Sequence, residues 1–338
     1  MNGEKNMNQK LWIRELGINQ RTLQAKKQQT EYKIKYVVEY VKEWILVNTN
    51  RSNVTNINFI DCMCNAGIYL DGDFCTSMEV LQVFVEAAKK HPDKRFNLFL
   101  NEKDQKRIAI IELISNKITE GQTLSNIAVE FKNEDVNDYL IDFGTLDKKL
   151  TYNCATVLFV DPYDFGTVQI DKLKKFICKY YCEVIFNFFI SDYVRNGIDS
   201  RIRSCIGEAQ INNKDELIDY IVNNIKVGKM KYIFSYKFKT ITNTELYQII
   251  FVTPHIRGLE KLKVALWTTF NGKFYHQNNY INPNQQSLFS IEDERQMILS
   301  IHAKEACEIT IRKFAKQTVS YKEIEAYLIE NSMLFSLT

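Results

Sequence analysis

Residues 57–67, with the sequence INFIDCMCNAG, decide the fold. The stretch begins as an apolar strand and ends in a turn of small residues that starts at Asp61. Asn65 tolerates positive φ better than other non-glycine residues, and Gly67 lets a ligand approach the backbone closely. An acidic residue here suits the ammonium group of a cofactor. A plain turn with a buried cysteine fits the same letters, so the interpretation of Asp61, Asn65 and Gly67 as cofactor contacts depends on the rest of the chain.

Strand-like and helix-like segments alternate after this stretch. Strands are predicted at 57–62, 96–101, 127–131, 156–161 and 183–189, with helices at 77–90, 103–118, 136–150 and 170–180 between them. Such alternation predicts a parallel sheet covered on both faces, because parallel strands need crossover connections. A helix at 214–225 and a hairpin at 231–239 and 246–253 follow. This order predicts a Rossmann-like α/β fold of the class I methyltransferase type, with a mostly parallel seven-stranded sheet and a closing antiparallel hairpin.

Three regions are expected along the chain. Residues 1–29 are polar and should form a loosely attached N-terminal arm or a short helix, and residues 30–275 should form the α/β domain. Residues 285–338 should form a small helical or winged-helix-like C-terminal appendage. Within it, Ser320 and Glu323 have the spacing of a capping box ahead of a helix.

Composition excludes several classes of protein. The net charge of +3, from 44 Lys and Arg against 41 Asp and Glu, gives the whole chain no strong attraction to a polyanion. The N-terminus lacks the apolar core of a signal peptide, and no apolar run approaches the ~20 residues of a membrane span. We therefore expect a soluble, cytoplasmic protein. The eight cysteines and four histidines lack the spacing of a metal site, so no metal is expected, and no P-loop or serine elbow is present.

Acidic residues follow the second and third predicted strands. In a doubly wound sheet ligands bind beyond the carboxyl ends of the strands. Glu102 is placed to accept hydrogen bonds from ribose hydroxyls, and Asp135 from an adenine amino group. Each residue also fits a purely structural role at the start of a helix, because acidic side chains are favourable there and Asp is a common N-cap.

The fourth predicted strand carries the sharpest local pattern, LFVDPYDFG at residues 158–166. Asp161 and the Pro162 carbonyl can accept hydrogen bonds from an exocyclic amine, while Tyr163 can stack on a flipped base. A strand-ending turn fits the same letters, since Asp and Pro favour turns. Together with the other strand ends, the pattern favours catalysis by Asp161, Pro162 and Tyr163.

Basic residues downstream are candidates for contacts with a nucleic-acid backbone. Arg195, Arg201 and Arg203 follow the fifth strand, and Lys237 lies among aromatic residues of the hairpin. Such residues can track phosphates and stack on bases. A solvated edge strand protected by lysines gives the same pattern in the hairpin.

The chain resembles the three-Cys-motif partner proteins, which have a class I methyltransferase-like core and are encoded beside a radical-SAM-like protein with a three-cysteine motif. The similar segments span about residues 30–275 and are the opening helix at 30–35, the loop 59–69, the turn 76–78, the strand end 159–163, the hairpin 247–259 and residues 265–267. Asn65 stands where the family has its first loop glycine, and Asp164 where a glycine would be expected. The resemblance implies S-adenosylmethionine (SAM) as cofactor, the radical-SAM-like protein as a possible partner, and a context of mobile elements or phage defence.

Two functions fit these patterns best. The first is a SAM-dependent methyltransferase acting on a base amine of a nucleic acid. The second is a catalytically silent module that senses a nucleotide-like ligand or docks the radical-SAM-like partner, which the altered loop at Asn65 favours. A third, in which the C-terminal appendage reads DNA as a winged helix, is disfavoured because its charge is mixed, with Lys313, Lys316 and Lys322 offset by Glu323, Glu325 and Glu330.

Overall fold

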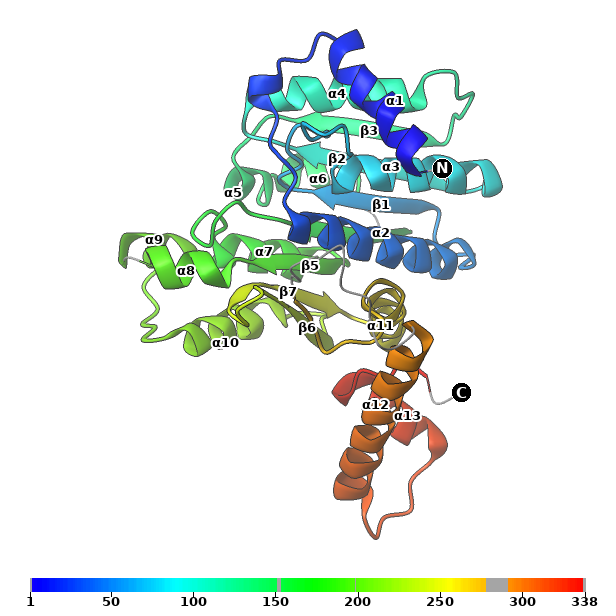
Figure 1. The fold of residues 1–338 in the computed structure, drawn as a ribbon, viewed down its shortest axis with the longest axis vertical. Helices are drawn as coiled ribbons and strands as arrows, with labels where there is room; N and C mark the ends of the chain where they lie inside the picture. Colours follow the sequence, from blue (N-terminus) through cyan, green and yellow to red (C-terminus); the bar gives the residue numbers. More distant parts are fainter. Residues whose placement is uncertain (1, 151–152, 198, 278–290, 337–338) are drawn as a thin grey trace.

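The computed structural model describes residues 2–150, 153–197, 199–277 and 291–336. Within them, eight strands form one sheet in the order β3-β2-β1-β4-β5-β7-β6-β8 (Figure 1). The strands are β1 (Asn56–Asp61), β2 (Arg95–Asn101), β3 (Ile127–Lys132), β4 (Cys154–Val160), β5 (Glu183–Phe188), β6 (Tyr232–Lys239), β7 (Glu245–Thr253) and β8 (Tyr275–Gln277).

The first five strands are parallel, and β7 lies antiparallel between β5 and β6. This confirms the predicted Rossmann-like fold with its closing hairpin. The expected number of seven strands is corrected to eight, because β8 adds a short parallel pairing with β6. Three residues are too few to show an alternating pattern, so the sequence gives no sign of β8.

Helices cover both faces of the sheet. Adjacent strand residues point to opposite faces, so Phe59 packs in one hydrophobic cluster and Ile60 in the other. On the Phe59 side lie α2 (Gln28–Thr49), α3 (Thr76–Lys90), α4 (Gln105–Thr119) and α11 (Ile256–Phe270). On the Ile60 side lie α5 (Val136–Tyr139), α6 (Phe143–Leu146), α7 (Ile170–Lys179), α8 (Ile190–Asn196), α9 (Asp199–Ile206) and α10 (Lys214–Ile225).

The single helix predicted at 136–150 is replaced by two short helices, α5 and α6. The Asp135 side chain caps α5 and the Asp142 side chain caps α6. A second N-cap inside the predicted span starts a new helix, which is why the apolar spacing alone was misleading.

The N-terminal segment packs against the core. Residues 1–29, expected as a loosely attached polar arm or a short helix, contain α1 (Asn2–Glu15) and the 3-10 helix η1 (Gln20–Thr22). Ile13, Ile18 and Leu23 are buried in the cluster on the Phe59 side of the sheet. These three side chains hold the polar segment to the domain, because burying them removes apolar surface from water.

The C-terminal segment contributes two helices, α12 (Ile291–Phe314) and α13 (Tyr321–Asn331). The predicted capping box of Ser320 and Glu323 is present at the start of α13. The buried Lys263 of α11 donates hydrogen bonds to the carbonyls of Ile329 and Ser332, which ties α13 to the core. Residue 285, where the appendage was expected to begin, lies outside the described residues, and between 291 and 336 the described structure contains helices and no wing-forming strand. In the described part of the chain, no helix has the length and apolar character needed to cross a bilayer.

Candidate functional site

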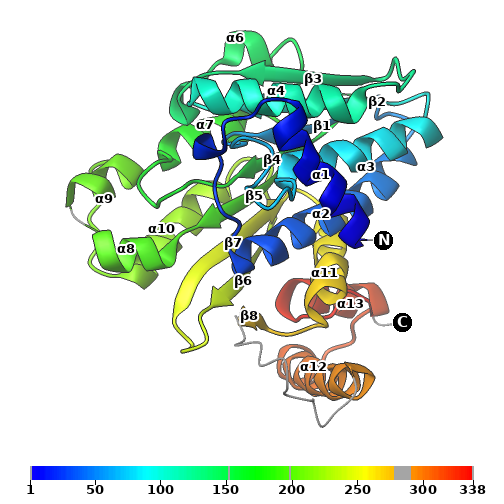
Figure 2. The same ribbon diagram turned by 45° about the horizontal axis from the view of Figure 1, so that its top comes forward.

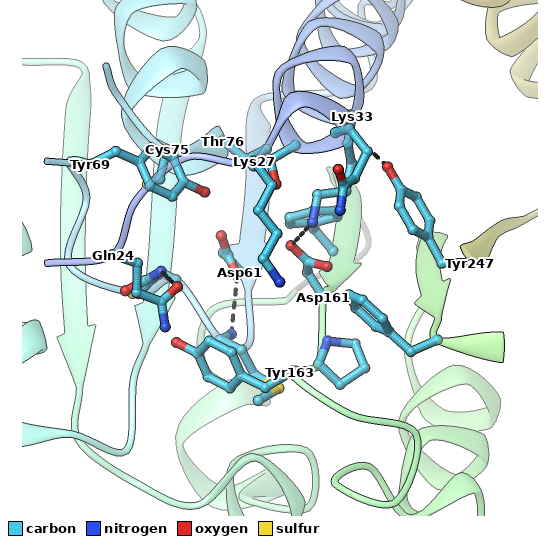
Figure 3. A pocket seen from close by; sticks show the side chains of 18 of the residues that line it. Gln24, Lys27, Lys33, Asp61, Tyr69, Cys75, Thr76, Asp161, Tyr163 and Tyr247 are labelled. Carbon is cyan, nitrogen blue, oxygen red and sulfur yellow. Dashed lines mark hydrogen bonds and ion pairs between the residues drawn. The ribbon is translucent and has the colours of Figure 1, made fainter. Parts of the chain in front are cut away.

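A cavity of about 470 Å³ lies beyond the carboxyl ends of β1 and β4 (Figure 3). The loops after these two strands form its floor, and residues 24–33 cover it from the other side. Nineteen residues line it, among them Gln24, Lys27, Lys33, Asp61, Asn65, Tyr69, Phe159, Asp161, Pro162, Tyr163, Phe189 and Tyr247. The predicted residues Asp61, Asn65, Asp161, Pro162 and Tyr163 are therefore brought together, as the end-of-strand argument requires.

Asp61, at the end of β1, is a buried acid that faces this cavity. Its side chain is 2% exposed and accepts hydrogen bonds from the Ser77 hydroxyl and from the Met63 backbone, the latter at 3.0 Å. Burial raises the pKa of Asp61 to about 7, and the nearby carboxylates of Asp161 and Glu102 add to the rise. Among the described residues, no Lys, Arg or His side chain lies within ion-pair distance of it. Asp61 is thus poised to pair with the cation of a ligand.

The turn after β1 contains two residues with a left-handed backbone. Asn65 adopts φ 59° and Gly67 adopts φ 81°. A Cβ on Gly67 would lie 2.8 Å from a side-chain carbon of Ile111, so α4 packs against the loop too closely for any other residue. Asn65 serves where a glycine is usual because its side chain supports a left-handed backbone.

Glu102, after β2, holds the loop in place with both carboxylate oxygens. Oε2 accepts from the Asn65 backbone at 3.0 Å and Oε1 accepts from the Asp104 backbone at 3.0 Å. The Tyr163 hydroxyl also donates to Oε2, at 3.3 Å, and itself accepts from Arg107 at 2.7 Å. The hydroxyl of Tyr163 therefore takes a lone pair of Glu102 that a ribose hydroxyl would use.

A second cavity of about 320 Å³ lies on the far side of Tyr163. Glu102, Asp135 and Val136 line it, and Met63 and Tyr163 line both cavities. Asp135 caps α5 and forms an ion pair with Lys103 at 2.9 Å. Asp135 therefore both caps a helix and lines a cavity. Tyr163 and Met63, which line both cavities, lie between them.

Asp161, after β4, is held by two partners that the sequence did not suggest. Lys33 of α2 forms an ion pair with it at 2.5 Å (Figure 3). The Asn187 side chain of β5 donates to its other oxygen at 2.6 Å. The signal for Lys33 is present in the sequence, because a lysine there occupies the same helical face as Val37, Tyr40 and Trp44. A lysine on the apolar face of a helix requires a buried acidic partner.

Residues 23–30, which we call the strap, comprise the segment after η1 and the first turn of α2, and they run past the ends of the strands (Figure 2). On one side, Gln24 accepts from the Asn65 side chain at 3.1 Å and Lys26 pairs with Asp73. On the other, the Tyr247 hydroxyl of β7 donates to the Gln29 carbonyl at 3.0 Å. The strap thus forms one wall of the cavity, although its polar sequence looked like a free arm.

The four basic residues predicted to contact nucleic acid lie outside the cavity and fall into two pairs. Arg201 is neutralised by Asp192 at 2.7 Å and by Asp164 at 3.3 Å, and Lys237 by Glu245 at 2.6 Å. Arg195 of α8 and Arg203 of α9 are exposed and have no acidic partner among the described residues. Figure 1 shows α8 and α9 at the end of the sheet toward which β1 points. Among the four, Arg195 and Arg203 are thus the ones whose charge is not neutralised by a described acid, and their helices lie toward the same end of the sheet as the cavity.

Comparison with known proteins gives structural similarity only. No family model and no curated protein matches the chain. The bifunctional kinase-methyltransferase WbdD is 12% identical over 66% of this chain and 39% of its own, with a TM-score of 0.37. Trm1 from Pyrococcus horikoshii, in complex with S-adenosyl-L-methionine, is 9% identical over 71% of this chain and 62% of its own, with a TM-score of 0.41.

The magnesium protoporphyrin IX methyltransferase from Synechocystis PCC 6803, with bound SAH, is 10% identical over 74% of this chain and 99% of its own, with a TM-score of 0.37. This chain has a class I methyltransferase fold. The strand order with β7 inserted antiparallel between β5 and β6 is the feature that decides it. The chain spans less than two thirds of the length of WbdD and of Trm1.

Proposed function

We propose that this chain is a SAM-dependent methyltransferase that acts on an exocyclic amine of a nucleic-acid base. The observation that carries the proposal is the buried carboxylate of Asp61, which forms no ion pair with a described residue and faces the cavity that also holds Asp161, Pro162 and Tyr163. A ligand with an ammonium group at one end would complete this site.

The residues present fit SAM at three points. Asp61 would pair with the ammonium group, Asn65 lines the cavity beside it, and Glu102 would accept from the ribose hydroxyls once Tyr163 moves aside. Asp135 and Val136 line the cavity suited to the adenine ring. When bound, SAM supplies a methyl group to the amine nitrogen, which loses a proton as the sulfonium becomes a thioether.

The chain's own residues would orient the amine. Each carboxylate oxygen has two lone pairs, so Asp161 can accept from an amine while it keeps its bonds to Lys33 and Asn187. The ion pair with Lys33 holds the carboxylate of Asp161 in place at the cavity. Tyr163 and Phe189 line the cavity and offer aromatic faces for a flipped base. Arg195 and Arg203 would bind phosphates of the same strand.

Calorimetric titration with SAM and transfer of a labelled methyl group to total RNA or DNA test this proposal. The wild-type protein should bind SAM and label one of the two nucleic acids. Asp161→Ala should lower the rate of transfer by ~100-fold or more, because the amine loses its acceptor. The exposed acid Asp219 in α10 gives a matched control, and Asp219→Ala should keep full activity. Absence of SAM binding by the wild-type protein would remove the proposal.

A second function is favoured by how fully the site residues already bond to one another. The Tyr163 hydroxyl is hydrogen-bonded to Glu102, and Lys33 is ion-paired with Asp161. Such a satisfied site is what we would expect of a module that docks a partner without catalysis. The resemblance to three-Cys-motif partner proteins names the radical-SAM-like protein as that partner. Capture of that protein from a co-expressing strain, with no methyl transfer to RNA or DNA, would favour this alternative. Turnover that Asp161→Ala abolishes would exclude it.

Replacing Tyr163 by Phe is expected to raise the affinity for SAM and SAH by ~10-fold. The change removes the hydroxyl that bonds to Glu102 and keeps the ring, so the Oε2 lone pair becomes available to a ribose hydroxyl. Calorimetric titration with SAH measures the effect. Tyr181→Phe, at a half-exposed tyrosine outside both cavities, is the control. An unchanged or weaker affinity would show that the ligand does not use Glu102.

A further inference from the structure

One face of α12 carries a regular stripe of exposed residues. Met297, Ile301 and Ile311 are 59%, 47% and 68% exposed, and Lys304 and Glu308 between them are exposed as well. With the exposed Ala315, which directly follows the end of α12, the stripe has spacings of four and three residues, which keep side chains on one line along a helix. The opposite face carries the buried Ile298, His302 and Ala306 and packs against the protein. Apart from Ile301, which also lines a cavity beside Phe274 and Tyr275, the residues of the stripe are turned away from this buried face.

The stripe is self-complementary: when a second copy runs in the opposite direction, each residue of the stripe meets one of matching character. Two copies of α12 laid antiparallel, and centred midway between Lys304 and Glu308, bring Lys304 of each opposite Glu308 of the other. The same register puts Ile301 opposite Ile311 and Met297 opposite Ala315. Charged pairs and apolar pairs both match, and a polar pair at the centre fixes a register as it does in coiled coils.

The ends of the helix are complementary in the same sense. The first turn of α12 carries Glu292, Asp293 and Glu294, and the last turn carries Arg312 and Lys313. Antiparallel pairing opposes the two helix dipoles favourably, and in this register it places the acidic turn of one copy past Arg312 and Lys313, at the basic end of the other. A parallel pairing would instead set like charges together at both ends and at Lys304 and Glu308.

The position of α12 leaves room for such a partner. Figure 1 shows α12 extending away from the sheet, with its C-terminal end at the tip of the molecule. An antiparallel partner therefore places its own body beyond that tip, at the opposite end from the first. We propose that the exposed stripe of α12 is a homodimer interface in which two copies of this chain pair as an antiparallel helix pair.

A contact along one 24-residue helix is small, so the dimer is weak, with an expected dissociation constant on the order of 10 µM. Sedimentation velocity on the full-length protein, at concentrations on either side of this value, should show a monomer-dimer equilibrium. A wild-type protein that stays monomeric at about ten times this concentration would overturn the proposal, whether the stripe is bare or covered by another protein.

Charge reversal tests the register. Lys304→Glu alone, or Glu308→Lys alone, creates two like-charge contacts and should weaken self-association roughly 30-fold. The double variant K304E/E308K should restore it, and the two single variants should associate when mixed in equal amounts. Both residues are exposed, so circular dichroism should show an unchanged fold. Single variants that dimerise as the wild type does, or a double variant that fails to recover, would overturn the proposal.

Discussion

Asp61→Asn is expected to abolish the binding of SAM and, at the same time, to stabilise the free protein. An uncharged Asn removes the counterion of the ligand's ammonium group, and loss of one partner of a desolvated charge pair costs about 2–5 kcal/mol, or 30-fold or more in affinity. Calorimetric titration measures this loss. Asp219→Asn, at an exposed acid of α10, makes the same change of charge outside the cavity and should leave the affinity unchanged.

The stabilisation follows from the pKa of Asp61. In the folded protein burial raises this pKa to about 7 from an ordinary value of 3.8, so the folded state holds the proton more tightly than the unfolded chain does. The contribution of Asp61 to stability is therefore largest below about pH 4 and is lost as the pH rises to about 7. Asp61→Asn has no such loss, and at pH 8 its free energy of unfolding should exceed that of the wild type by on the order of 3 kcal/mol. Urea unfolding at pH 5 and pH 8 checks this, and equal stabilities at pH 8 would contradict it.

The same ionisation predicts how binding depends on pH. SAM pairs with the carboxylate form of Asp61, so protonation competes with the ligand below about pH 7. The affinity of the wild type should therefore fall toward ~10-fold per pH unit as the pH drops below 7. An affinity that is flat between pH 6 and 8 would mean that another group receives the ammonium.

Lys33→Met is expected to destabilise the fold by about 3 kcal/mol. The side chains of Lys33 and Asp161 are 9% and 21% exposed, and removing the lysine leaves a largely buried carboxylate without its cation. Urea unfolding measures the effect. Lys35→Met is the matched control, because Lys35 is an exposed residue of the same helix, and its change should lie within about 0.5 kcal/mol of zero.

The double variant K33M/D161N separates the ion pair from the packing of the lysine stem. The amide that replaces the Asp161 carboxylate keeps an oxygen for the Asn187 side chain and needs no cation. The double variant should therefore be more stable than the sum of the two single changes implies, by about 2 kcal/mol. Strictly additive effects would mean that Lys33 acts through its methylenes alone.

The sequence predicts the sheet well because the strands that form it are buried on both faces and appear as short apolar runs. The acids and small residues at their ends are equally visible, so Asp61, Glu102 and Asp161 can be assigned to one edge of the sheet from the sequence alone. The partners of these acids come from elsewhere in the chain. Lys33 meets Asp161 across 128 residues, and no local pattern specifies which acid a buried lysine will reach.

The strap shows a different limit. Its polar residues are those of a solvated segment, and pattern alone favours an arm free of the domain. What holds the strap is the docking of Ile13, Ile18 and Leu23 on either side of η1, together with single hydrogen bonds to Asn65 and Tyr247. Isolated contacts of this kind, between a single side chain and a single distant group, produce no periodic pattern in the sequence. For this reason the sequence does not predict that Gln24 and Lys27 line the cavity.

The strap also sets when the site can form during synthesis. Gln29 leaves the ribosome early, yet its carbonyl receives the hydroxyl of Tyr247, which is made 218 residues later. Contacts between such distant residues must wait until the intervening chain has been made, and domains fold as units. A nascent chain that ends before β7 therefore lacks Tyr247, which lines the cavity and holds the strap at Gln29. The protein acquires a closed site only when nearly the whole α/β domain has emerged, so fragments and stalled chains lack the complete site.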